Sequence, residues 1–175
     1  MEELQELIKG CAANNMLSQE KLYRKFYPAL FLLCKKFIAD DRDALEALND
    51  GMLKVYKNIA KYKTEKGDFF NWLYTIIRNT VLDKLKIVKL PVSQELKADI
   101  KEEEASPLNK LEWKDIYILL DSLNPSTRAV CSLFYLEGFS VTDISECLQI
   151  STGTVKWHLS ETRRKLKPVM EKYYT

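Results

Sequence analysis

The stretch "ISTGTVKWHLSETRRKL", residues 150–166, decides how the C-terminal part of the chain folds. At about 100° per residue, its apolar and small side chains fall on one narrow side of a helix: Val155, Leu159, Thr162 and Leu166. Ser151 is a suitable N-cap for this helix. The preceding stretch, "SVTDISECLQ", predicts a shorter helix capped by Ser140, which buries Ile144 and Leu148. Two short helices joined by a tight turn predict a helix-turn-helix.

The outward face of the second helix carries side chains that suit a DNA major groove. Trp157, Ser160, Glu161 and Arg164 lie opposite the apolar side, Lys156 and Arg163 flank one edge, and His158 and Lys165 flank the other. An ordinary solvated helix that ends in basic residues would show a similar pattern, because the helix dipole favours cations there. An exposed indole is poorly solvated, so Trp157 favours a binding partner, and the geometry fits DNA.

The rest of the chain is also predicted to be helical. Its 175 residues include only five glycines and five prolines, and 46% are hydrophobic. We predict an all-α protein of two small helical domains, residues 1–87 and 111–175, joined by a flexible acidic linker at residues 88–110. Basic residues dominate on both sides of that linker, so a net charge of only +2 conceals two candidate surfaces for a polyanion.

Helical periodicity predicts three or four packed helices in the first domain. One begins after Ser18 and contains Pro28, which is expected to kink or break it. Another begins near Asp41 or Asp43, and a third is capped by Asp68. In the second domain, one helix spans about residues 111–123, and Asn124 caps the next, which ends at Gly138.

Several functional classes find little support. The four cysteines form no C-x-x-C pair and the chain has one histidine, so we expect no metal site and no cofactor. An enzyme is disfavoured, because there is no phosphate-binding glycine loop. No apolar run approaches the roughly 20 residues that span a bilayer, and the N-terminus lacks the pattern of a signal peptide. We therefore expect a cytoplasmic protein without membrane insertion.

Three further stretches carry a family resemblance. Residues 120–166 resemble region 4 of bacterial sigma-70-family initiation factors, and "TVKWHLSETRRKL" is also similar to the output domain of LuxR-type regulators. "DALEALNDGMLKVYKNIAKY", residues 43–62, is similar to sigma region 2.2. "FFNWLYTIIRNTVLDKL", residues 69–85, is similar to regions 2.3 and 2.4. Both regions in this order resemble the extracytoplasmic-function (ECF) group, whereas a LuxR-type protein would carry a receiver or ligand domain instead.

The resemblance implies a dissociable initiation subunit whose partners are core RNA polymerase, promoter DNA and an anti-sigma factor. Region 4 would contact the −35 element through Arg128, Ser151, Thr152, Thr154, Lys156, Trp157, His158, Ser160, Glu161, Arg163 and Arg164. Regions 2.3 and 2.4 would contact the −10 element through Tyr62, Lys63, Lys66, Asp68, Trp72, Arg78, Asn79, Lys84 and Lys86. Region 2.2 would contact the polymerase through Leu45, Glu46, Asn49, Asp50 and Met52, with Asp43 as the helix cap.

The chain departs from the family pattern at a few positions. "KLKIVKL" replaces a run of arginines after region 2.4, Gly51 lies inside the region 2.2 helix, and "VKWHL" replaces the usual "VKSRL". Trp72 could stack on DNA, but its helical spacing with Phe69 and Ile76 favours a core position. Side chains of the recognition helix set base preference, so the promoter is not inherited from relatives. A stand-alone, LuxR-like helix-turn-helix regulator is the alternative function.

Overall fold

The computed structural model describes residues 2–87 and 113–173, and all the regular structure within these ranges is helical. The prediction of an all-α fold is therefore confirmed. The predicted linker, residues 88–110, lies outside the described residues. The chain divides into two compact units, residues 1–35 with 40–84, and residues 36–39 with 85–175. Within the described ranges, no helix is long and apolar enough to cross a membrane.

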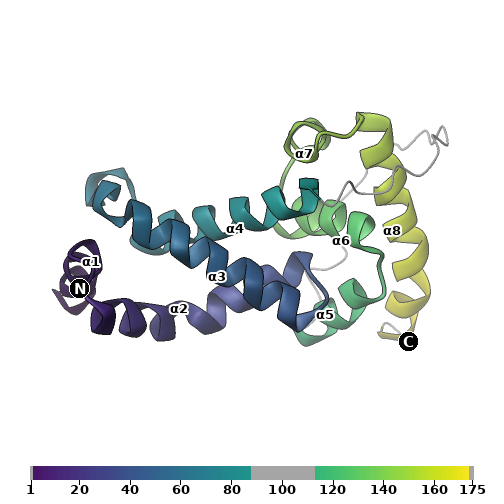
Figure 1. Ribbon diagram of the computed structural model, residues 1–175. Helices are drawn as coiled ribbons and strands as arrows, with labels where there is room; N and C mark the ends of the chain where they lie inside the picture. The colour runs from purple at the N-terminus through teal and green to yellow at the C-terminus, as the bar shows by residue number, and fades with distance from the viewer. Residues whose placement is uncertain (1, 88–112, 174–175) are drawn as a thin grey trace. The chain divides into compact units, whose positions relative to one another are not determined.

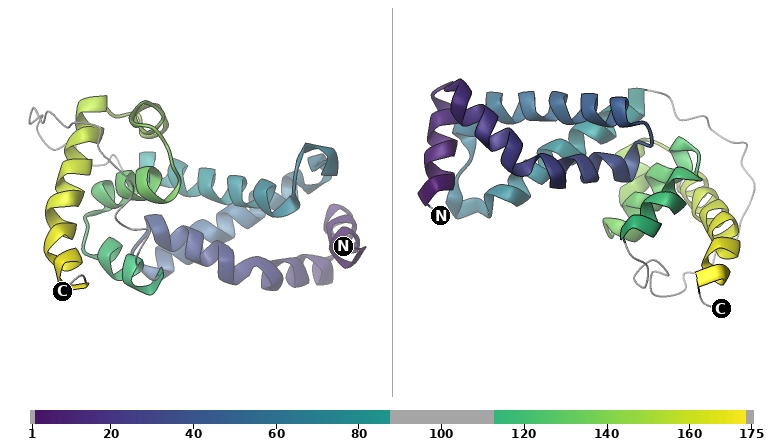
Figure 2. Two further views of the ribbon diagram at one scale, coloured as in Figure 1. Left: turned by 180° about the vertical axis from the view of Figure 1, so that it is seen from behind. Right: turned by 90° about the horizontal axis from the view of Figure 1, so that it is seen from below.

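The first unit is built around three long helices. These are α2 (Met16–Phe37), α3 (Asp41–Asn58) and α4 (Phe69–Ile87), which lie side by side in Figures 1 and 2. The short helix α1 (Glu2–Ala12) lies at the end where α2 begins, next to the 3₁₀ turns η1 (Ile59–Lys61) and η2 (Thr64–Lys66). The core is formed by apolar residues that repeat every three or four positions along these helices, including Leu22, Leu30, Leu33, Leu48, Val55, Leu73, Ile77 and Val81.

Helix starts follow side-chain capping, although not always at the predicted residue. Asp68 Oδ2 accepts a hydrogen bond from Phe70 N at 2.8 Å, as its predicted role as a cap requires. At α3 the cap is Asp40, whose Oδ1 accepts from the backbone N–H groups of Arg42 and Asp43 at 2.8 and 3.0 Å. The prediction that Asp43 caps this helix is therefore wrong.

Two further expectations for α2 are corrected. The helix begins before Ser18, and Asn15 Oδ1 accepts from Ser18 N at 2.9 Å. It also continues through Pro28, which neither breaks nor ends it. Pro28 is exposed, so water can reach the carbonyl that lacks its usual donor.

Gly51 has a packing role that the sequence did not reveal. It is buried where α3 crosses α4, and a Cβ at this position would lie 2.5 Å from Ile77 Cδ1 and 3.4 Å from Ile77 Cα. Real Cβ atoms essentially never come within 3.0 Å of a neighbour, so the Ile77 Cδ1 methyl would have to move. The glycine therefore allows the two helices to approach each other.

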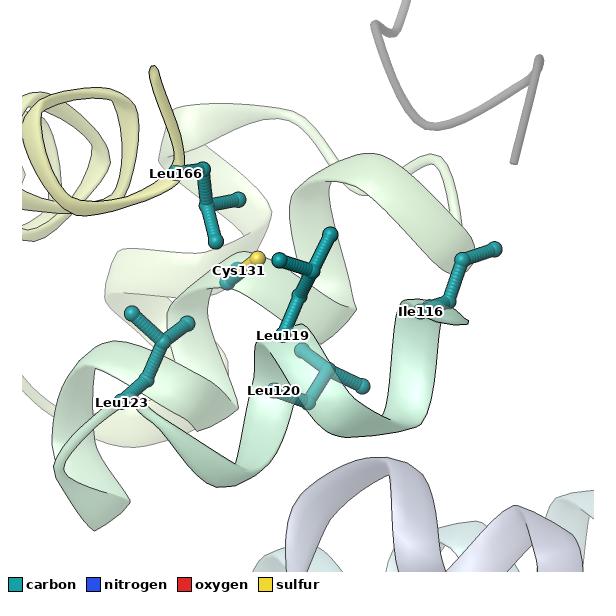
Figure 3. Close-up of a cluster of buried hydrophobic side chains, with 6 residues drawn as sticks. All are labelled: Ile116, Leu119, Leu120, Leu123, Cys131 and Leu166. Atoms are coloured by element: carbon teal, nitrogen blue, oxygen red, sulfur yellow. The ribbon is translucent and has the colours of Figure 1, made fainter. Parts of the chain in front are cut away.

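The second unit contains α5 (Trp113–Asp121), α6 (Pro125–Cys131), the π-helical segment η4 (Ser132–Leu136), α7 (Val141–Leu148) and α8 (Thr152–Tyr173). A cluster of buried side chains joins α5, α6 and α8: Ile116, Leu119, Leu120, Leu123, Cys131 and Leu166 (Figure 3). Asn124 caps α6 as predicted, its Oδ1 accepting from Thr127 N at 2.9 Å. The cluster and the cap fix α6 against α8.

Candidate nucleic-acid interface

The helix-turn-helix forms as predicted, from α7, the turn at residues 149–151 and α8. Ser140 and Asp143 form a capping box at the start of α7. Gln149 takes the left-handed conformation that ends the helix, with φ 56°. Ser151 Oγ accepts from Thr154 N at 3.0 Å and caps α8. The predicted inner side of α8 is buried together with Ile144 and Leu148 of α7: Val155, Leu159, Thr162 and Leu166.

The outer surface of α8 is polar and mostly accessible. Ser151, Thr152, Lys156, Arg163 and Arg164 are exposed, and Trp157, Ser160 and Glu161 are half-buried. This surface is the part of the predicted −35 site that could meet a groove.

One ion pair on the outer surface changes what it offers to DNA. Arg164 donates two hydrogen bonds to the Glu161 carboxylate, at 2.7 and 2.9 Å, and these bonds hold the pKa of Glu161 below its usual value. The fork of Arg164 that would recognise a guanine is therefore engaged within the helix.

Three residues predicted to contact the −35 element are corrected. His158 is buried, and its Nδ1 lies 2.9 Å from Thr127 Oγ1. Thr154 is buried and hydrogen-bonded to Ser151 Oγ at 2.9 Å. Arg128 is buried, and its Nη1 donates to Asp121 Oδ1 at 2.6 Å. The helical wheel predicts His158 at the edge of the outward face of α8 when α7 is the only helix packed against it. In the structure α6 also packs against α8 and covers this edge.

Burial also changes the chemistry of His158. Desolvation lowers its pKa to about 4, and the charge of the nearby Glu161 acts in the opposite direction. The ring is therefore neutral at physiological pH and acts as a packing group. Trp157 contacts its edge, with ring centroids 4.9 Å apart, which explains why the indole is only partly exposed.

The α3 surface predicted to bind polymerase is accessible at four of its five positions. Leu45, Glu46, Asn49 and Asp50 are exposed, whereas Met52 is only 2% exposed and belongs to the core. The inclusion of Met52 is therefore wrong. Leu53, which was not predicted, is 52% exposed and extends the apolar part of this surface. Its spacing from Leu45 and Asn49, four residues a step, could have indicated it.

Lys84 contacts this acidic surface. Its Nζ lies 2.7 Å from Glu46 Oε1 and 2.8 Å from Asp50 Oδ2. Burial lowers the pKa of Lys84, but the hydrogen bonds to Asp50 and Glu46 and the charges of these two carboxylates together raise it above its usual value. Lys84 was predicted to contact −10 DNA. In the structure it neutralises carboxylates predicted to meet the polymerase, because α4 runs antiparallel to α3 and brings its last turns beside the first turns of α3.

The other end of the α3–α4 seam is basic, amide-rich and aromatic. Lys54, Asn58 and Lys61 of α3 and η1 face Trp72, Ile76, Asn79 and Thr80 of α4 across a pocket of about 360 Å³. Lys61 Nζ donates to Asn58 Oδ1 at 2.9 Å. Five of these residues, Lys54, Asn58, Lys61, Ile76 and Thr80, were not predicted as site residues. The sequence pattern that could have indicated Lys54, Asn58 and Lys61 is their spacing at i, i+4 and i+7, which places them on one side, facing the W-L-Y helix α4.

The aromatic residues beside this pocket support one another. The Tyr62 ring lies 5.0 Å from that of Phe69 and 5.5 Å from that of Trp72, and the Tyr62 hydroxyl donates to Gly67 O at 2.9 Å. Trp72 is half-buried, so it combines core packing with an accessible edge.

The remaining predicted −10 residues lie in the loop before α4 and along α4 itself. Lys63 and Asp68 are exposed beside Tyr62, and Asn79 is exposed on α4. Arg78 and Lys86 are half-buried, and the side chain of Lys66 lies outside the described part.

Comparisons with known proteins agree with both units. Residues 22–87 match the family model "Sigma-70 region 2", and residues 119–168 match "Sigma-70, region 4". The chain is 25% identical over 165 residues to the ECF RNA polymerase sigma factor SigE of Mycolicibacterium smegmatis, covering 90% of this chain and 63% of that protein. It is 24% identical over 177 residues to the ECF RNA polymerase sigma factor SigM of Mycobacterium tuberculosis, covering 92% and 81%.

Among solved structures, the sigma factor RpoE in complex with the anti-sigma factor NepR from Bartonella quintana aligns with a TM-score of 0.48 at 19% identity, covering 87% of this chain and 96% of that one.

The presence of a region 2 match decides between the two functions that the helix-turn-helix allowed. A stand-alone LuxR-like regulator would not carry region 2, and the curated relatives are sigma factors, a non-enzymatic class of initiation factor. The two family models match in the order of the chain and fall on the two helical units described above. This chain therefore belongs to the sigma-70 family of RNA polymerase sigma factors, in its ECF group.

Proposed function

We propose that the chain is a dissociable initiation subunit that acts in the cytoplasm, where it binds core RNA polymerase and directs it to promoters. The observation that carries this proposal is the polarity of the α3–α4 seam. Its acidic end presents Glu46 and Asp50, with the exposed Leu45 and Leu53 on the same helix. Its other end presents lysines, amides and the Trp72 edge. One face suits a basic protein partner, and the other suits a nucleic-acid strand.

Each interface then has its own role. The exposed part of α8 enters the major groove at the −35 element, with Lys156 and Arg163 as the accessible cations. The pocket lined by Lys54, Asn58, Lys61, Trp72 and Asn79 holds the displaced strand of the −10 element, by aromatic stacking and by phosphate contacts. The chain supplies no catalytic group or cofactor, since nucleotide addition belongs to the polymerase.

An anti-sigma factor is the expected inhibitor. The ECF resemblance implies that such a protein sequesters the chain. The exposed leucines of α3 would then contact either the polymerase or the inhibitor. An exposed apolar patch marks a protein-interaction site, and two partners cannot cover the same patch at the same time.

Run-off transcription tests this function. Bacterial core polymerase is incubated with fragments of the host genome, with and without the full chain, and the RNA 5′ ends are mapped. The proposal expects discrete new start sites that share sequence elements near −10 and −35. Binding of the chain alone to a palindromic duplex, with no new start sites, would instead support a stand-alone regulator.

Replacing Lys84 with methionine is expected to strengthen binding to core polymerase by about three- to fivefold, since exposed ion pairs contribute about 1 kcal/mol or less. An arginine of the polymerase would no longer compete with Lys84 for Glu46 and Asp50. Fluorescence anisotropy of the labelled chain measures the affinity. Lys57→Met, which removes an exposed cation elsewhere on α3, is the matched control. Weaker binding by Lys84→Met alone would show that Lys84 assists docking.

A further inference from the structure

A tyrosine of the π-helical segment η4 contacts the side of the recognition helix α8. The Tyr135 hydroxyl oxygen accepts a hydrogen bond from Arg163 Nε at 3.1 Å, although the two residues are 28 positions apart in the chain. Single π-helical turns are frequent at functional sites, and this one places a phenol beside a predicted DNA contact. Tyr135 itself was not predicted as a site residue.

The ring of Tyr135 is fixed by packing. It is half-buried, lies against the cluster that joins α5, α6 and α8, and makes an edge-to-face contact with Phe134, with ring centroids 5.0 Å apart. A tyrosine has only two side-chain torsions to fix, so a packed ring holds its hydroxyl at a defined position. The guanidinium of Arg163 is therefore oriented before DNA arrives.

The contact orients Arg163 without neutralising it. A phenol is uncharged, whereas the neighbouring Arg164 is held by the Glu161 carboxylate at 2.7 and 2.9 Å. The bond to Tyr135 uses the Nε–H of Arg163, and four further N–H groups lie on its two terminal nitrogens. The Tyr135 hydroxyl accepts this bond through a lone pair and has its own proton to donate. The two side chains together can therefore donate to a single anion.

The position of Arg163 on α8 favours a phosphate over a base edge. Lys156, Arg163 and Lys167 are all exposed, and their spacing of i, i+7 and i+11 aligns them within about 40° along one edge of the helix. In a helix-turn-helix the first residues of the recognition helix reach the bases, so an edge that continues along the helix faces the wall of the groove. Arginine and hydroxyl donors are the usual partners of the phosphates there.

We propose that Tyr135 and Arg163 together bind one phosphate on the wall of the −35 major groove. Tyr135 donates its hydroxyl proton to the phosphate and also positions the guanidinium of Arg163. This inference rests on the proposed function and deepens it, because it requires the holoenzyme to bind promoter DNA through α8. It adds η4 to the interface as a contact that sets the register of α8 in the groove.

Replacement of single phosphates in the promoter tests the inference. Holoenzyme is assembled from core polymerase and the full chain, and its affinity is measured for a promoter found by run-off mapping. Each phosphate across the −35 element is then replaced in turn by an uncharged methylphosphonate. Tyr135→Phe keeps the ring and removes only the hydroxyl, so it is expected to weaken binding of the unmodified promoter about fivefold. This loss should disappear when the methylphosphonate is at the bound position and persist when it is elsewhere.

Arg163→Met should identify the same phosphate. It is expected to weaken binding about tenfold and to reduce the slope of log affinity against log salt by about one, because one phosphate contact is lost. Both variants should keep the start sites and the −35 base preference of the wild type, since a phosphate contact carries no sequence information. The control is Tyr117→Phe, which removes a hydroxyl from a ring packed against the same buried cluster and should show no dependence on any single phosphate.

The outcomes separate this inference from the proposed function. A purely structural role for Tyr135 would give the same loss with every methylphosphonate. That result, or equal affinities for wild type and Tyr135→Phe, would overturn the inference while start-site selection remains intact. Losses for Tyr135→Phe and Arg163→Met that depend on different phosphates would overturn the shared site as well. If the wild type produces no start sites with core polymerase, the proposed function itself fails and the inference fails with it.

Discussion

Gly51→Leu is expected to lower the free energy of unfolding of the first unit by about 3 kcal/mol, the upper part of the range for overpacked cores. A Cβ at this position already lies 2.5 Å from Ile77 Cδ1, and Ile77 is itself fully buried. The leucine must therefore separate α3 from α4 or force Ile77 out of its rotamer. Gly51→Ala should cost much less, since its gain in helix propensity, about 1 kcal/mol, offsets the smaller clash.

Hydrogen exchange of α3 and α4 peptides at increasing urea concentrations measures this effect within the first unit. Lys57→Leu adds the same leucine at an exposed position of α3 and should leave the exchange nearly unchanged. Equal protection of Gly51→Leu and wild type would show that the helices do not need the close approach.

Acidification from pH 6.5 to pH 4 is expected to remove about 3 kcal/mol from the stability of the second unit. Burial lowers the pKa of His158 from 6.5 to about 4. The unfolded chain therefore binds a proton at His158 before the folded chain does, and stability falls as the pH falls through this window. The contribution of His158 is complete above pH 6.5 and is lost at about pH 4.

Urea unfolding at several pH values, followed by tryptophan fluorescence in a Trp72→Phe background, measures this dependence in the second unit. The capping carboxylates Asp40 and Asp143 have lowered pKa values, so they lose their contributions below their ordinary value of 3.8. Glu161, whose pKa is also lowered, loses its contribution to stability only below pH 4.5, its ordinary pKa. His158→Gln should abolish the slope between pH 6.5 and pH 5. An unchanged slope in that variant would assign the effect to another group.

Local signals predicted most of the helices. Asn124, Ser140, Ser151 and Asp68 were identified as caps from the residue type and the apolar period that follows, and the structure contains the corresponding hydrogen bonds. The cap of α3 was missed because three aspartates occur within four positions and the local chemistry of each is the same. Asp40 is the cap because the chain leaves the extended conformation there and α3 begins at Asp41, which the residue types alone do not reveal.

The candidate site was less predictable because packing between helices assigns its side chains. His158 and Thr154 look accessible on an isolated helix. In the structure both are buried, His158 against Thr127 of α6 and Thr154 against the capping hydroxyl of Ser151. Lys84 looks like a DNA contact by its position after the W-L-Y motif, yet the antiparallel α3 supplies its two carboxylates. The reason for Gly51 likewise depends on Ile77, which is 26 residues further along the chain.

Binding of the full chain to bacterial core RNA polymerase tests the central claim most directly, with wild type compared with Asp50→Arg by co-elution and anisotropy. Asp50 is an exposed carboxylate of the acidic α3 surface, so reversing its charge should weaken saturable one-to-one binding about tenfold or more. Glu146→Arg, the same reversal at an exposed position of α7, should bind like the wild type. Wild-type binding that Asp50→Arg leaves unchanged would contradict docking through α3, and no binding at all would contradict the sigma-factor function.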